Sequence, residues 1–134
     1  MIDAKFAPYG ALVLRVTTGA LFVYHGLLKL LVFTPAGAAG FFDSIGLPGW
    51  LAYLTMTAEI LGGGALILGI ATQLVSAALV PVLLGAALFA HRGAGFGWTN
   101  PGGGMEFPLM WAAVQASLAL IGDGAHALYP LRRT

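Results

Sequence analysis

The feature that most constrains this chain is a series of four apolar stretches, each about long enough to cross a bilayer. A hydrocarbon core of about 30 Å is spanned by about 20 apolar residues in an α-helix. Stretches of this kind occupy residues 9–33, 48–70, 72–91 and 107–128. The sequence therefore predicts an all-α membrane protein, a four-transmembrane-helix bundle formed by one domain over residues 1–134.

The composition excludes several other classes of protein. The chain is 59% hydrophobic and only 8% charged, whereas soluble domains are about 25% charged. A net charge of +1 without a basic stripe argues against nucleic-acid binding. The chain has no cysteine, so disulfides and thiolate metal ligands are absent, and no metal site is expected. The lipid bilayer is the first partner that the sequence predicts.

The connections between the stretches differ in length and character. Only a tight turn at residues 69–72 separates the second and third stretches, which predicts an antiparallel hairpin. Residues 34–47 contain an aromatic pair and several polar residues, which favours a short interfacial helix. Residues 92–106 are rich in glycine, which is typical of a flexible loop. That loop is either a simple linker or the cover of a site.

The distribution of basic residues predicts the orientation of the bundle. Four spans place both termini on one side of the membrane. Lys5, Arg132 and Arg133 belong to that side, against Lys29 and Arg92 on the other. Basic residues are enriched on the cytoplasmic side, so we expect both termini to be cytoplasmic.

Charged side chains inside the spans are costly and need partners. From the rise of 1.5 Å per residue, Arg15 lies about 9 Å and Glu59 about 13 Å above the inner face of the membrane. We therefore expect a buried ion pair between Arg15 and Glu59, with Asp123 as the competing partner of the arginine. Such a pair has a purely structural interpretation, in which it only holds the bundle together.

A second group of polar residues is expected near the outer face. His25 and Lys29 are four residues apart and share one face of the first helix. His91 ends the third stretch and Glu106 begins the fourth, both beside the glycine-rich loop. Titratable groups gathered beside an apolar interior are typical of a ligand-binding pocket. The alternative interpretation is that these residues anchor helix ends among the lipid headgroups.

Several short motifs, in order and at matching spacing, resemble those of the DoxX family of small four-helix bacterial membrane proteins. They are Phe22-x-x-His25-Gly26-x-x-Lys29, Phe41-Phe42-x-x-x-Gly46-Leu47-Pro48, Glu59-x-x-Gly62-Gly63, Leu68-Gly69 with Thr72, His91, Gly95-Phe96, Gly103-Gly104-x-Glu106 and Gly122-x-Gly124. One departure lies near the C-terminus. The family often has a serine and an aspartate after its final glycines, whereas Gly124 here is followed by Ala125 and His126.

The resemblance implies a membrane subunit associated with redox chemistry in the bacterial inner membrane. The founding members of the family look like the quinone-side subunit of a thiosulfate:quinone oxidoreductase. A quinone is thus the candidate ligand, and a soluble oxidoreductase is the candidate protein partner. The resemblance does not establish a reaction, and most of the family has no assigned activity.

Other functions fit the same residues. A small proton-coupled transporter or channel, assembled as a homo-oligomer, would use Glu59 as its proton carrier. A structural membrane anchor for a partner oxidoreductase would need only the glycine-rich second helix and the short loops. Haem held between His25 and His91 is a weaker hypothesis, because two histidines are common in a chain of this size.

Overall fold

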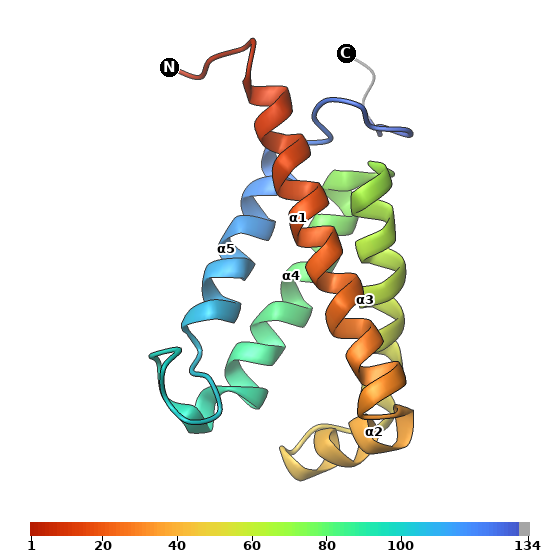
Figure 1. Ribbon diagram of the computed structural model, residues 1–134, viewed down its shortest axis with the longest axis vertical. Coiled ribbons are helices and arrows are strands. Elements are labelled where there is room, and N and C mark those ends of the chain that lie inside the picture. Colours follow the sequence, from red (N-terminus) through yellow and green to blue (C-terminus); the bar gives the residue numbers. More distant parts are fainter. Residues whose placement is uncertain (132–134) are drawn as a thin grey trace.

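The computed structural model describes residues 1–131 and is built almost wholly from helices (Figure 1). The only β-type pairing among these residues is an isolated bridge between Ile70 and Tyr129. The elements, in chain order, are α1 (Ala7–Leu27), the π-helical turn η1 (Leu28–Val32), α2 (Pro35–Ser44), α3 (Trp50–Leu68), α4 (Thr72–Gly85), the π-helical turn η2 (Ala86–Ala90), the 3-10 turn η3 (Arg92–Ala94) and α5 (Glu106–Ile121).

Three helices are long and apolar enough to cross a membrane, and they confirm the first three predicted spans. They cover Ala7–Val32, Trp50–Leu68 and Thr72–Ala90. Only 33%, 28% and 22% of their most apolar windows are buried inside the protein. Most of their apolar side chains therefore face outward, as they would toward lipid.

The fourth predicted span, residues 107–128, is corrected by the structure. The helix α5 has 16 residues and ends at Ile121, which makes it about 24 Å long. Gly122 leaves the helix with a φ of 93°, a conformation that glycine adopts without steric cost. The residues after it turn back over the ends of the other helices instead of extending α5. A count of four spans is therefore not established by helix length alone.

The predicted hairpin between the second and third stretches is confirmed. Gly69 ends α3 with a φ of 71°, and the amide of Ile70 donates to the carbonyl of Ala65 at 2.8 Å. This is the left-handed ending that commonly closes a helix. The chain then enters α4 at Thr72 with almost no connecting loop.

Small residues bring α1 and α3 into close contact, as is common for helices in membranes. A Cβ added at Gly19 would lie 2.7 Å from the carbonyl oxygen of Gly63, and one added at Gly63 would lie 2.6 Å from that of Gly19. Farther along α1, a Cβ at Gly26 would lie 2.6 Å from Ile60 Cγ1. Gly63, in the glycine run of α3, is thus required for the close contact with α1.

The bundle is tighter at one end than at the other. Helix α1 packs mainly on α3, and α4 packs mainly on α5. The two pairs lie together at the end that carries both termini, and they spread apart toward the end that carries α2 and the loop of residues 95–105 (Figure 1). We call these the closed end and the open end. Helix α2 lies across the open end, beside α3.

The predicted flexible loop is in fact held by hydrogen bonds. The amide of Met105 donates to the carbonyl of Gly95 at 2.9 Å, and the amide of Glu106 donates to that of Phe96 at 2.9 Å. Gly104 is buried so tightly against the Phe96 backbone that a side chain there would collide with it. The glycines allow a compact loop rather than a mobile one.

Candidate functional site

The side chain of Arg15 lies at the closed end and is 1% exposed. Its Nε donates to the carbonyl of Asp123 at 2.9 Å, and its terminal nitrogens donate to the carbonyls of Leu66, Ile67 and Ala125 at 2.7–3.0 Å. The first and last of these carbonyls belong to the segment after α5, and the other two end α3. One guanidinium therefore joins α1, the end of α3 and the C-terminal segment.

This arrangement contradicts the predicted ion pair between Arg15 and Glu59. Glu59 instead pairs with Lys29, whose Nζ lies 2.8 Å from Oε2 and 3.0 Å from Oε1. Asp123 meets Arg15 only through its main-chain carbonyl, while its carboxylate accepts from the amide of Thr72 at 3.0 Å. The predicted alternative, an ion pair between Arg15 and Asp123, is therefore also wrong.

The wrong partner was predicted for Arg15 because its depth in the membrane relative to α3 was misjudged. The prediction measured Arg15 from the start of the first apolar stretch, but α1 extends beyond the end of α3. Arg15 is level with Ile67, which it contacts. Ile67 is eight residues from Glu59, or about 12 Å along α3. An arginine at this level meets the last carbonyls of α3, whereas Lys29 is level with Glu59.

His25 and Lys29 share one face of the first helix, as predicted, since Lys29 Nζ also lies 3.5 Å from the carbonyl of His25. The His25 ring packs beside Trp111 of α5, with 5.4 Å between ring centroids. Lys29 and His91 are both within electrostatic range of His25. The polar cluster at the open end therefore contains His25, Lys29 and Glu59, with His91 at its edge.

Trp111 closes the apolar side of this cluster. It is 5% exposed and is packed between Phe22, at 4.5 Å between centroids, and Phe107, at 5.6 Å. Its indole Nε1 is buried and has no hydrogen-bond partner among the described residues. A buried N–H without an acceptor is uncommon and calls for an explanation.

The other two predicted pocket residues lie against the glycine-rich loop. The ring nitrogen Nδ1 of His91 hydrogen-bonds to the carbonyl of Gly103. Glu106 is exposed, and its carboxylate accepts from the amide of Trp98 at 3.1 Å. The structure thus brings His91 near the cluster but places Glu106 at the start of α5, where it lines a separate shallow hollow with Trp98, Phe107 and Met110.

Sequence reasoning missed one buried polar pair. Gln115 of α5 donates through Nε2 to Ser76 Oγ of α4 at 2.9 Å, and both side chains are fully buried. The signal was present, because each residue is a polar side chain in the middle of an apolar stretch. Arg15 gave no comparable signal for its partners, since backbone carbonyls have no sequence signature.

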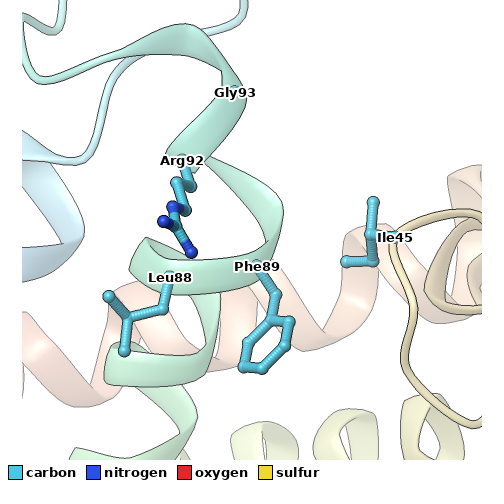
Figure 2. A pocket seen from close by; sticks show the side chains of 5 residues that line it. All are labelled: Ile45, Leu88, Phe89, Arg92 and Gly93. Carbon is cyan, nitrogen blue, oxygen red and sulfur yellow. The ribbon is translucent and has the colours of Figure 1, made fainter.

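A hollow of about 750 Å³ lies at the open end, between the two halves of the bundle. Figure 2 shows its lining, with Leu88, Phe89 and Arg92 on one side and Ile45 on the other. The hollow is mostly apolar, with the guanidinium of Arg92 as its charged group. Its volume is in the range of small-molecule sites in proteins.

The chain is similar to known proteins over most of its length. The DoxX family profile matches residues 10–92. The chain belongs to the DoxX family. It is 36% identical over 126 residues to a Bacillus subtilis (strain 168) protein named "Putative oxidoreductase CatD", an alignment that covers 94% of this chain and 89% of that protein. No solved structure matches the chain significantly.

The family match confirms the resemblance found in the motifs. It covers the tight contact of α1 with α3, the ion pair of Lys29 with Glu59, and His91. Helix α5, which supplies Trp111 and Gln115, lies outside the matched range. This DoxX protein is thus a membrane protein whose relative is named as an oxidoreductase.

Proposed function

We propose that this protein is an integral membrane subunit of a redox system and that its open end binds a quinone or a similar membrane-soluble carbonyl compound. The observation that carries the proposal is the unpartnered Nε1–H of Trp111 beside the ring of His25. The relative named as an oxidoreductase supports the redox association.

The residues present fit the chemistry of a quinone. A quinone needs an apolar slot for its ring and hydrogen-bond donors for its carbonyl oxygens. Trp111 supplies a donor against an aromatic wall made by Phe22 and Phe107. His25 supplies an imidazole, which can donate a hydrogen bond from one ring nitrogen and accept one at the other. A bound quinone would supply the electron-accepting chemistry, and these side chains would bind and orient it.

The ion pair of Lys29 with Glu59 has a supporting role in this proposal. Both carboxylate oxygens of Glu59 accept from Lys29, at 2.8 and 3.0 Å. This contact joins the end of the first helix to α3, which favours a structural role for Glu59 over the proton carrier of the transporter hypothesis. The bond from Lys29 to Glu59 fixes where the turn η1 lies along α3. It thereby also fixes the position of His25, one helical turn away.

The ligand would enter from the bilayer through the hollow between α2 and η2. That hollow is mostly apolar and lies at the same end as the cluster. Arg92 at its edge would attract a polar head, while Leu88 and Phe89 would contact an apolar tail. A membrane-soluble compound would thus enter the open end from the bilayer.

Membrane placement is also part of the proposal. We propose that α5 is the fourth span, with its flanking residues completing the crossing of the bacterial inner membrane, and that both termini are cytoplasmic. The hydrogen bond from the amide of Ala125 to the carbonyl of Pro8 supports termini on one side. Arg132 and Arg133, which contribute to the predicted orientation, lie outside the described residues. Reporter fusions after residue 134 and within residues 93–104 should give opposite locations, and the same location would contradict this topology.

Extraction of bound lipid tests the proposed function. The protein is purified in mild detergent and the extract is analysed for quinone, with His25→Phe as the test variant. Tyr24→Phe, at the adjacent exposed position, is the matched control. We expect quinone with the wild type and the control, and at least fivefold less with His25→Phe at unchanged melting temperature. Equal retention by all three proteins, or none by any, would leave the structural-anchor hypothesis as the better account.

A further inference from the structure

A second hollow, of about 270 Å³, lies where the loop of residues 95–105 meets the start of α5. It is lined by Trp98, Glu106, Phe107 and Met110. The loop and the first turn of α5 lie at the open end of the bundle (Figure 1). The ring of Phe107 packs against Trp111 and remains 42% exposed. The hollow is thus separate from the one that leads toward the cluster of His25.

The carboxylate of Glu106 is the charged group of this hollow. Its Oε2 accepts from the backbone amide of Trp98 at 3.1 Å, which holds the carboxylate against the loop. In the part of the chain that the structure describes, Oε1 accepts no hydrogen bond and no cation pairs with the carboxylate. A carboxylate only accepts hydrogen bonds, and its strongest partners are positively charged donors. The hollow therefore suits a cation that donates hydrogen bonds.

The other lining groups indicate which kind of cation fits. The side chain of Trp98 is 67% exposed, so aromatic surface is available to a ligand from both Trp98 and Phe107. Aromatic rings attract organic cations, and tryptophan does so most strongly. Met110 adds a polarisable apolar contact. A metal ion such as Ca²⁺ would need several oxygen ligands, whereas one carboxylate beside aromatic rings suits an alkylammonium group.

The place of the hollow indicates where such a group would come from. Glu106 is the first residue of α5, and apolar residues follow it as far as Leu109. With α5 as the proposed fourth span, the hollow lies at the level of the lipid headgroups, where tryptophan is enriched. Met110, Ala113 and Ser117 continue from Glu106 along one exposed face of α5, at spacings of three and four residues. A lipid acyl chain would lie along this face.

We propose that this hollow binds the ammonium headgroup of a phospholipid, as in phosphatidylethanolamine, in the leaflet at the open end. The ammonium donates to Oε1 of Glu106 and contacts the rings of Trp98 and Phe107. Exposed ion pairs contribute little by themselves, so the aromatic contact is needed for affinity. Liquid water occupies about 30 Å³ per molecule, so the hollow has room for a headgroup of a few heavy atoms. The inference uses the proposed placement of α5 and is independent of quinone binding.

Native mass spectrometry measures this binding and assigns it to the hollow. The protein is purified in detergent, stripped of lipid and titrated with phosphatidylethanolamine. We expect Glu106→Gln to bind this lipid at least fivefold more weakly than the wild type. Its affinity for phosphatidylglycerol, which has no ammonium group, should not fall. Asp3→Asn removes the same charge at an exposed position of the closed end, and this control should leave both affinities unchanged.

A second variant tests the aromatic contact. Trp98→Leu keeps the backbone amide that donates to Glu106, and it should weaken the binding of phosphatidylethanolamine at least threefold. No bound phosphatidylethanolamine in the wild type, or an unchanged affinity in either variant, would overturn the proposal. An equal loss in Asp3→Asn would assign the effect to net charge and would also overturn it. Displacement of the lipid by free ethanolamine at millimolar concentration would show that the hollow takes a soluble amine, and the assignment to a lipid would be wrong.

Discussion

The two ends of this bundle use buried charge in different ways. At the closed end, Arg15 donates four hydrogen bonds to main-chain carbonyls. At the open end, Lys29 and Glu59 satisfy each other, and His25 and the indole N–H of Trp111 remain available beside them. A charge that is satisfied by backbone holds elements together. Polar groups without a protein partner are the ones left to meet a ligand.

The largest effect on stability should come from the closed end. Arg15→Met would remove the donor from four carbonyls, of which that of Leu66 is buried and the other three are partly buried. A buried group without a partner costs about 1–3 kcal/mol, so we expect a loss of about 3–4 kcal/mol in the free energy of unfolding. Arg92→Met, the same change at an exposed position, should stay within about 0.5 kcal/mol. Similar losses in both variants, measured by unfolding in detergent, would remove the distinction between the two ends.

The ion pair at the open end should give the next largest effect. Lys29→Met would leave the carboxylate of Glu59 buried without its cation, which we expect to cost about 2–3 kcal/mol. The double variant with Glu59→Gln should be more stable than the single variant by at least about 1 kcal/mol. A double-mutant cycle measures this coupling. Strictly additive effects would mean that the two side chains do not depend on each other.

The contact between α1 and α3 runs between the two ends. Substitutions there should change the free energy of unfolding less than those at either end. Gly63→Ala would place a Cβ 2.6 Å from the carbonyl oxygen of Gly19, and such overpacking costs about 1–3 kcal/mol. Gly64→Ala is the matched control, because nothing lies within 4 Å of its Cβ position. That change should stabilise α3 by up to about 1 kcal/mol. Equal melting temperatures in the two variants would contradict the close approach.

The smallest effect on stability is expected at Glu106, the first residue of α5. Glu106→Gln keeps an oxygen that can accept from the amide of Trp98, so stability should change by less than about 0.5 kcal/mol. Quinone retention should also stay near the wild-type level, because Glu106 lines a hollow to which His25 does not contribute. A complete loss of quinone retention in this variant would show that Glu106 belongs to the binding site.

The part of this architecture that follows from hydrophobic length was predictable. Apolar stretches of about 20 residues predicted the first three spans, and the short connection at residues 69–72 predicted their hairpin. The end of α5 was not predictable in the same way, because Gly122 is compatible with both a helix and a turn. Only its φ of 93° decides between them.

The candidate site was predictable only in part, because its contacts depend on how far one helix is shifted along another. The spacing of His25 and Lys29 predicted their shared face. Their partners on other helices depend on how far α1 overhangs α3, and a single sequence does not give that offset. Trp111, which the structure buries beside His25, gives no sequence signal for that contact.

Fluorescence of Trp111 provides the most direct test of the claim that the open end is the functional end. In a Trp50→Phe, Trp98→Phe background, Trp111 is the sole tryptophan. The protein in detergent micelles is titrated with decylubiquinone, and quenching of the emission is recorded. We predict saturable quenching that persists in Tyr24→Phe and is weakened at least tenfold in His25→Phe. Quenching that rises linearly without saturation, or that is the same in His25→Phe, would contradict the account.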